Sequence, residues 1–385
     1  MHRVILLMDF FEEFSKQLLT GITQYSKEHG SWVFCRMPLY YRESKGISGI
    51  VEWGRKWKAD GLIGQLYHDK DIDLFRKAGI AAIAQDFKEL FEEIPNITGN
   101  YLETGHLAAE YFLRKGFKHF AFYGFKNIVW SRERAKGYVE RLRENGHQVH
   151  FFKRKKNKSQ EIWHYKPTLL AKWVQQIPKP VAILCCDDNQ AFHITEVCKQ
   201  INIRVPEEVA VLGVDNDELI CELSDPPLSS IKLDAVKGGY EAAEMLNKMI
   251  TQNTPGYNII VKPSQIVTRQ SSNIFATEDQ SVLITLKYIH SHYQEKLSVN
   301  KLVSLVPLSR RVFEKRFKLA TGYPVYRYIF NLRMEKFANL LLETDKSIFQ
   351  AALHTGFDDS KNISRQFKKL KGCTPVEYRK RHIAF

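Results

Sequence analysis

Residues 347–369 read SIFQAALHTGFDDSKNISRQFKK. Gly356 supplies a turn with positive φ, so we predict a short apolar helix before it and a second helix after it. Ile363 and Phe367 stand four residues apart and are expected to bury one face of the second helix, which leaves its Lys and Arg residues outward. A short helix, a turn and a basic helix are typical of a helix-turn-helix unit, whose second helix enters the major groove of DNA.

The same arrangement occurs about 50 residues earlier, at 298–318. Pro307 blocks extension of the first helix, Ser309 is placed to cap the second, and Phe313 and Phe317 repeat the buried pair. Between the two units, the apolar spacing over 324–342 predicts a helix that is about 30 Å long. That length is close to the roughly 34 Å between successive major-groove faces, so one helix would hold both units on one side of a duplex.

Positive charge is concentrated in this part of the chain. The 385 residues contain 57 Lys and Arg against 43 Asp and Glu, a formal net charge of +14. Residues 280–385 alone hold 20 Lys and Arg against 8 Asp and Glu. A near-neutral body with a basic end favours a polyanionic partner, most simply DNA, although a basic surface also serves solubility.

The basic residues of the two units divide into two predicted roles. Those near the N-terminal turns of the second helices are expected to contact bases: Arg310, Arg311, Lys315, Ser360, Lys361 and Arg365. Those deeper or further along are expected to contact phosphates: Arg316, Lys368 and Lys369.

The first 270 residues have a different pattern, in which apolar runs alternate with amphipathic helical segments. The predicted strands are 4–8, 32–37, 61–66, 81–85, 119–125, 181–186 and 209–214. Strands that are apolar almost throughout imply a parallel sheet covered by helices on both faces. Breaks near residue 100 and near 230–260 indicate two similar lobes. We therefore predict an α/β domain at 1–272, a linker at 273–279 and an all-α domain at 280–385.

Polar and aromatic side chains follow several of these strands, where open α/β sheets bind their ligands. Carboxylates and an Arg fork suit paired sugar hydroxyls, and an aromatic face suits the C–H surface of a sugar ring. The candidate ligand-binding residues are Asp9, Phe10, Phe14, Ser15, Trp130, Glu133, Arg134, Asp187, Asp215 and Asn216. Taken alone, Asp187, Asp188 and Asp215 are each equally well explained as helix N-caps.

The sequence lacks the motifs that are typical of several other classes of protein. The chain has no G-x-G-x-x-G, P-loop, H-E-x-x-H or G-x-S-x-G motif, so no cofactor, metal site or catalytic centre is predicted. Its six cysteines form no C-x-x-C pair, and no apolar run approaches the ~18 residues of a membrane span. We expect a soluble cytoplasmic protein with reduced cysteines. A sugar-converting enzyme would need a general base, for which Asp187, Asp215 or Glu133 could nominally serve.

Residues 280–385 resemble an AraC-type DNA-binding domain. The resemblance rests on GF at 356–357, SRQFKK at 364–369, GCTP at 372–375 and YR at 378–379. Asn362 departs from the pattern, because the family usually has an aromatic residue there.

Residues 3–272 resemble the LacI-type regulator core, which is similar to periplasmic sugar-binding proteins. The matching segments follow in order: FAFYG at 120–124, RERAKG at 132–137, CDDNQA at 186–191, VLGVDND at 211–217, PLSSI at 227–231 and VTRQSS at 267–272. By this resemblance Arg134, Asp187 and Asp215 fall where the family contacts sugar hydroxyls.

A LacI-type core followed by an AraC-type domain is the arrangement of the bacterial xylose-operon regulators, which the chain resembles from end to end. The resemblance implies a xylose or related pentose ligand, operator DNA, a homodimer formed through the body, contact with RNA polymerase and an activating role. Trp130 with Glu133 and Arg134 resembles that family's pentose-contact segment, whereas the loop 9–15 is more aromatic and acidic than the family leads us to expect. The alternatives are a sugar-converting enzyme fused to a DNA-binding domain and a regulator whose body binds protein.

Overall fold

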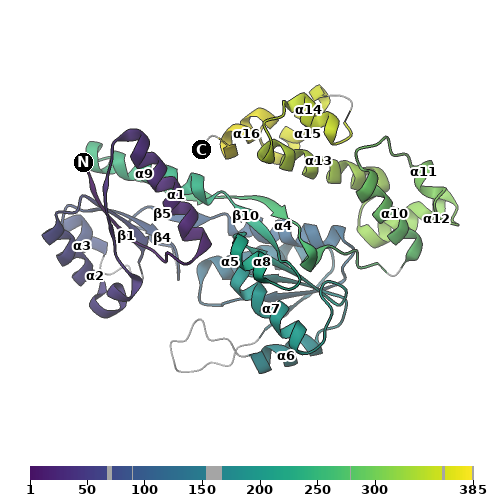
Figure 1. Ribbon diagram of the computed structural model, residues 1–385, viewed down its shortest axis with the longest axis horizontal. Coiled ribbons are helices and arrows are strands. Elements are labelled where there is room, and N and C mark those ends of the chain that lie inside the picture. The colour runs from purple at the N-terminus through teal and green to yellow at the C-terminus, as the bar shows by residue number, and fades with distance from the viewer. Residues whose placement is uncertain (67–71, 89, 153–166, 278, 358–359, 384–385) are drawn as a thin grey trace.

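The computed structural model describes residues 1–66, 72–88, 90–152, 167–277, 279–357 and 360–383. Two α/β lobes are followed by a helical domain that lies along one side of them (Figure 1). The predicted fold class, a two-lobed α/β region followed by an all-α double helix-turn-helix region, is confirmed.

The first lobe is built on a six-stranded parallel sheet in the order β11-β5-β4-β3-β1-β2. Its strands are β1 (Arg3–Leu7), β2 (Val33–Arg36), β3 (Gly61–Gln65), β4 (Ala81–Gln85), β5 (Asn96–Gly99) and β11 (Ile259–Val261). Its helices are α1 (Glu13–His29), α2 (Leu39–Trp57), α3 (Ile72–Lys77) and α9 (Ala235–Gln252). Helices α1 and α9 pack closely where Gly239 faces Leu18. A Cβ at position 239 would lie 1.9 Å from the carbonyl oxygen of Leu18, so glycine is required there.

The second lobe has a sheet in the order β12-β10-β9-β8-β6-β7. Strands β10 and β12 pair antiparallel, and the other described neighbours in this sheet pair parallel. Its strands are β6 (His119–Tyr123), β7 (Val149–Phe151), β8 (Val181–Cys185), β9 (Val209–Val214), β10 (Ser229–Leu233) and β12 (Pro263–Val267). Its helices are α4 (Tyr101–Arg114), α5 (Val129–Glu144), α6 (Pro167–Gln176), α7 (Asp188–Gln200), α8 (Glu218–Leu223) and the 3-10 turn Gln270–Ser272.

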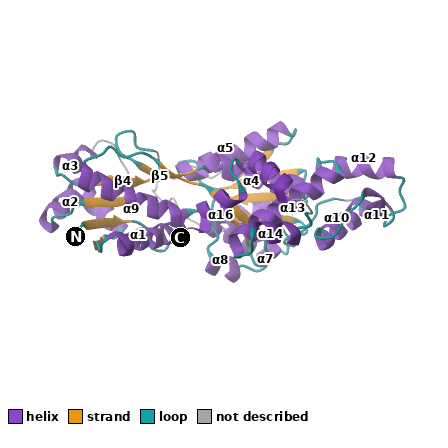
Figure 2. Ribbon diagram, turned by 90° about the horizontal axis from the view of Figure 1, so that it is seen from above, coloured by secondary structure: helices purple, strands orange, loops and turns teal. Residues whose placement is uncertain are grey.

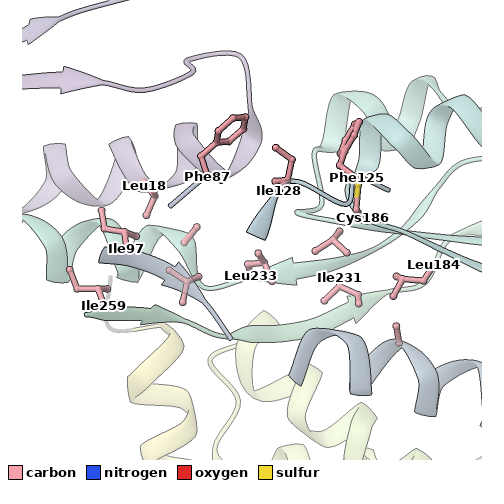
Figure 3. Packing of buried hydrophobic residues seen from close by; sticks show 14 of the residues in the cluster. Leu18, Phe87, Ile97, Phe125, Ile128, Leu184, Cys186, Ile231, Leu233 and Ile259 are labelled. Atoms are coloured by element: carbon pink, nitrogen blue, oxygen red, sulfur yellow. The ribbon is translucent and has the colours of Figure 1, made fainter. Parts of the chain in front are cut away.

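The chain crosses between the lobes three times: from β5 to α4, from β10 to α9 and from β11 to β12. These crossings coincide with the breaks predicted near residue 100 and near 230–260. The backbone amide of Val129 donates to the carbonyl of Phe87 across the lobes, over 2.9 Å. One buried apolar cluster runs from Leu18 in the first lobe to Leu184 in the second (Figure 3). The lobes therefore share a continuous core on the crossover side.

The predicted strands agree with the observed ones to within one or two residues at each end. Helix α2 begins at Leu39 and is interrupted at Gly46, which has a φ of 64°. The apolar pattern did not single out β5, β7, β10, β11 or β12, which are three to five residues long.

The helical domain contains two small cores on the two halves of one long helix, α13 (Val325–Glu343). The first half packs with α10 (Gln280–His292), α11 (Val299–Val303) and α12 (Arg310–Thr321). The second half packs with α14 (Ile348–His354), α15 (Ser360–Lys371) and α16 (Pro375–Ile383). Phe313, Phe317 and Phe367 are fully buried, as the spacing predicted, and Ile363 is 5% exposed.

The helix ends of this domain follow the expected chemistry with one exception. Ser298 caps α11, and Ser347 forms a capping box with Gln350 at the start of α14. Gly356 has a φ of 83°, as predicted for the turn. Ser309 occupies the N-cap position of α12, but its side chain makes no capping hydrogen bond, so the prediction that it caps this helix is wrong.

The helical domain contacts the second lobe at several points, and Figure 2 shows α13 and α16 lying over that lobe. The Arg114 guanidinium pairs with Glu335 on α13 at 3.1 Å. The Tyr378 hydroxyl donates to the carbonyl of Ser264 at 3.1 Å, and the amide of Ala276 donates to the carbonyl of Lys115 at 2.8 Å. Helix α4 therefore begins at Tyr101, where the chain crosses between the lobes, and ends at Arg114, which contacts the helical domain through Glu335. In the described residues, no helix is long and apolar enough to span a bilayer.

Candidate functional site

Side chains from both lobes surround a cavity of about 60 Å³. The first lobe contributes the start of α1 and the end of β4, and the second lobe contributes the starts of α4, α5 and α7 and the turn after β9. The lining residues are Glu12, Glu13, Phe14, Gln85, Asp86, Tyr101, Trp130, Arg134, Asp187, Asp188, Asn189, Val214, Asp215 and Asp217. The cavity lies at the carboxyl ends of the strands, where open α/β sheets bind ligands.

Arg134 is the one cation among the described residues that line this cavity, and it is 3% exposed. Its Nη1 donates to the carbonyl of Cys186, and its Nη2 donates to Asp215 Oδ1 at 3.3 Å. The guanidinium lies 5.3 Å from the ring centre of Trp130 and 5.4 Å from that of Tyr101, within cation–π range. Arg134 Nε is buried and has no hydrogen-bond partner among the described residues.

The turn after β9 has an unusual backbone. Asp215 and Asn216 have φ values of 102° and 54°, in the region that favours glycine. This conformation places the Asp215 carboxylate on the cavity and sends the Asn216 side chain elsewhere, where its Oδ1 accepts from Arg269 Nη1 at 3.0 Å. Strain of this kind is often found at ligand sites.

Asp187 and Asp188 begin α7 and have different partners. Asp187 Oδ1 accepts from the amide of Gln190 at 2.7 Å, so Asp187 is an N-cap that also lines the cavity. Asp188 accepts from the hydroxyl of Ser230 at 2.5 Å and from the amide of Asp217 at 2.7 Å. Asp188 therefore ties β10 and the turn after β9 to the start of α7.

The first lobe contributes a second group of acidic side chains. Asp86 directly follows β4, and the hydroxyl of Tyr101 donates to both of its carboxylate oxygens, at 2.8 and 3.0 Å. Glu12 immediately precedes α1 and makes no capping hydrogen bond there. The beginning of α1 and the end of β4 thus bring carboxylates to face those of the second lobe.

Burial is the main cause of the shifted pKa values in the cavity. It raises the pKa of Asp86 and that of Asp187 to about 6, and it raises the pKa of Asp188 well above its usual value. For Asp215 burial also raises the pKa, while the charge of Arg134 opposes the rise. Burial raises the pKa of Glu12 to about 8, with further contributions from the charges of Asp9, Asp187 and Asp215.

Five of the ten predicted ligand-binding residues meet in this cavity: Phe14, Trp130, Arg134, Asp187 and Asp215. Trp130 and Arg134 are four residues apart on α5, so they share one face of that helix. Glu133 lies on a neighbouring face, where it pairs with Arg132 at 3.1 Å.

The other predicted residues lie near the cavity without lining it. Asp9 accepts from the amide of Phe11 at 2.9 Å within its own turn, and the ring of Phe10 lies 4.1 Å from the Arg36 guanidinium. Ser15 is buried and accepts from Gln85 Nε2 at 3.3 Å, which holds Gln85 in place.

The prediction omitted nine lining residues: Glu12, Glu13, Gln85, Asp86, Tyr101, Asp188, Asn189, Val214 and Asp217. Gln85 is the last residue of the predicted strand 81–85 and Asp86 directly follows it, so the rule that selected residues at the ends of the other strands applied here as well. Tyr101 follows the predicted break near residue 100. A residue at a break between lobes is a candidate for the space between them, so this position could have been predicted.

The predicted DNA contacts of the first helix-turn-helix unit are exposed on α12. Arg310 pairs with Glu314 at 3.1 Å, and Arg316 pairs with Asp279 at 3.5 Å, whereas Arg311 and Lys315 project to solvent. On α15, Arg365, Lys368 and Lys369 are exposed. The side chains of Ser360 and Lys361 lie outside the described part of the chain.

Comparison with known proteins finds matches for both parts. Residues 109–272 match a periplasmic binding protein-like domain, and residues 302–381 match a helix-turn-helix domain. The xylose operon regulatory protein of Escherichia coli K12 is 27% identical, and the match covers 98% of this chain and 97% of that protein. The xylose operon regulatory protein of Haemophilus influenzae is 26% identical over 98% of each chain.

Solved structures are similar as well. The structure of a xylose-binding transcription activator matches with a TM-score of 0.59 and 26% identity, over 98% of this chain and 97% of the other. A dimeric lac repressor matches with a TM-score of 0.57 and 18% identity, over 71% of this chain and 99% of the other, which shows a shared fold of the two lobes.

Proposed function

Since the chain is a homologue of the xylose operon regulatory proteins along almost its whole length, we propose that it is a sugar-responsive bacterial transcription regulator. The two lobes bind an aldose, with D-xylose or a related pentose as the reference ligand, and the helical domain binds operator DNA. We propose the limits 1–272 for the sugar-binding domain, 273–279 for the linker and 280–385 for the DNA-binding domain.

The observation that carries the sugar assignment is the pairing of Arg134 with Asp215 beside Trp130 in the cavity between the lobes. Ionised donors and acceptors of this kind make strong, directional hydrogen bonds to vicinal hydroxyls. An aromatic ring beside them covers the apolar face of a sugar. The remaining proposed contacts are Phe14 and Asp187 on the same cavity.

The DNA assignment is supported by the repeat of a short helix and a basic helix on both halves of α13. Arg311 and Lys315 on α12 and Arg365 on α15 are exposed. We propose that they contact bases, and we propose the same role for Arg310, Ser360 and Lys361. Arg316, Lys368 and Lys369 are proposed to contact phosphates.

Further parts of the proposal concern partners and location. We propose that the protein acts as a cytoplasmic homodimer through its two-lobed region, activates transcription through RNA polymerase and has no enzymatic activity. All six cysteines are free, which suits a reducing compartment. In the cavity Asp215 is paired with Arg134 and Asp187 caps α7, so neither is placed as an uncommitted general base.

Calorimetric titration of the full chain with D-xylose and a panel of pentoses and hexoses tests the sugar assignment. A gel-shift titration on DNA from its own promoter, with and without the sugar that binds, tests the regulatory assignment. We expect at least one sugar to bind and to change the DNA affinity. Turnover of the bound sugar would support an enzyme instead, and binding of no sugar would support a body that recognises protein.

A further inference from the structure

The cavity between the lobes is lined by many more carboxyl groups than cationic groups. Of the described residues that line it, seven carry a carboxyl group and Arg134 alone is a cation. Arg134 is paired with Asp215, and Lys16, outside the cavity, lies 3.4 Å from Glu13 and 3.8 Å from Asp217. Glu12, Asp86 and Asp187 form no ion pair within 4.0 Å in the described parts of the chain.

A buried amide oxygen adds to this excess of acceptors. Gln85 lines the cavity, is 3% exposed and uses its Nε2 to donate to Ser15. Its Oε1 has no hydrogen-bond partner among the residues that the structure describes. A buried acceptor without a donor costs free energy, so a donor is expected from the ligand.

The chemistry of the donor follows from this imbalance. A hydroxyl brings one donor and two acceptor lone pairs, whereas an ammonium brings three donors, a positive charge and no acceptor. A metal ion is a poorer candidate, because no group of three or more His, Cys, Asp or Glu is arranged to hold one within the described ranges.

We propose that the ligand is an amino sugar, whose protonated amino group lies among Glu12, Asp187 and Gln85 while its hydroxyls meet Arg134 and Asp215. This inference rests on the proposed function, because it names the sugar class that the same cavity takes. The rings of Phe14, Tyr101 and Trp130 line the cavity as well, and aromatic faces attract both sugar C–H groups and cations.

The titration of Glu12 supplies a signature for such a ligand. Its pKa is raised to about 8 by burial and by the charges of Asp9 in the preceding turn, Asp187 at α7 and Asp215 after β9, while a hydrogen bond from Gln65 on β3 opposes the rise. At pH 7 the free protein therefore keeps Glu12 largely protonated. An ammonium beside it favours the ionised form, so binding releases a proton to the buffer. A neutral aldose brings no charge and releases none by this route.

Calorimetry of the full chain at pH 7, in two buffers with different heats of ionisation, tests the proposal. The ligands are matched pairs, D-glucosamine with D-glucose and D-galactosamine with D-galactose, together with their N-acetyl derivatives and D-xylose. We expect at least one amine to bind tenfold or more tightly than both its neutral parent and its N-acetyl derivative, with proton release.

Variants separate a charge effect from a general loss of binding. We expect Glu12→Gln to reduce the ratio of amine affinity to parent affinity about tenfold and to abolish the proton release. Glu144→Gln is the matched control, because Glu144 is exposed at the end of α5 and pairs with Arg141 outside the cavity. It should keep both the ratio and the proton release.

The outcomes distinguish this inference from the proposed function. If every neutral sugar binds at least as tightly as its amine, the amino-sugar inference fails and sugar sensing stands. If neither amines nor neutral sugars bind, both fail. An amine preference that survives Glu12→Gln also overturns the inference, because the carboxyl group of Glu12 would then play no part.

Discussion

The cavity between the lobes and the outer faces of α12 and α15 carry ionisable groups of opposite kind in opposite surroundings. In the cavity, carboxylates are withdrawn from water, and several are fixed by specific donors, as Asp188 is by Ser230. On α12 and α15, Arg311, Arg365 and Lys369 project into solvent. Buried charges are costly and demand a partner of defined geometry. Exposed charges act over a Debye length and weaken with salt. The two regions should therefore differ in how sharply binding depends on a single residue.

The largest effect is expected inside the cavity, from Arg134→Ala. Removing the guanidinium leaves the Asp215 carboxylate and the Cys186 carbonyl without this donor, and it removes the cationic contact that we propose for the sugar. Sugar affinity should fall by about 3 kcal/mol, more than a hundredfold. Calorimetric titration measures the loss.

Arg141→Ala is the matched control for Arg134→Ala. Arg141 lies on the same helix, but it is half-exposed and pairs with Glu110 and Glu144 away from the cavity. It should keep the sugar affinity of the unmodified protein. If Arg134→Ala binds sugar as tightly as Arg141→Ala, the cavity has been wrongly assigned.

The next largest effect is expected in the helical domain, where Gly→Ala changes test whether this domain can lose stability while the lobes still bind sugar. Gly356 has a φ of 83°, and an added Cβ would lie 2.7 Å from the carbonyl oxygen of Tyr293 and 2.8 Å from that of Gln294. Gly322 has a φ of 76° with open space around it. Either Gly→Ala change should lower the free energy of unfolding by about 1 kcal/mol, because alanine disfavours the left-handed backbone conformation. At Gly356 the collision of the new Cβ with the two carbonyl oxygens should increase this loss of stability by about 2 kcal/mol.

Denaturant unfolding and gel shifts compare Gly356→Ala with Gly322→Ala. Gly356→Ala should weaken DNA binding more strongly, and both variants should bind sugar normally. Loss of sugar binding in Gly356→Ala would mean that the helical domain and the lobes do not fold as separate cores.

The smallest effects are expected on the exposed helices. Arg311→Ala should weaken binding to operator DNA by about 1–2 kcal/mol and relax the sequence preference at one position. Lys369→Ala is the comparison, because a phosphate contact weakens binding to every sequence alike and reduces the slope of log affinity against log salt by about one unit. Gel shifts at two salt concentrations, on operator and scrambled duplexes, separate the two roles. An equal loss on both duplexes for Arg311→Ala would refute base contact.

Features that depend on neighbouring residues in the chain could be predicted from the sequence. The two helix-turn-helix units followed from the spacing of Phe313 and Phe317 and from Gly356, because a helix face and a turn are local properties. The second-lobe side of the cavity could also be predicted from the sequence, since Trp130 and Arg134 share one face of α5 soon after a buried strand. The two sheets were visible because strands buried on both faces are apolar throughout.

The opposite wall of the cavity was settled only by the tertiary structure. Asp86 and Tyr101 belong to different elements, and the lobe crossing brings the Tyr101 hydroxyl within 2.8 Å of Asp86. Asn216 looked equivalent to Asp215 in the sequence, but positive φ at both residues turns its side chain to Arg269. Periodicity reports which residues are buried, because burial depends on the local alternation of apolar side chains. It does not report which buried carboxylates face one another, because that depends on how two lobes joined by three crossings pack.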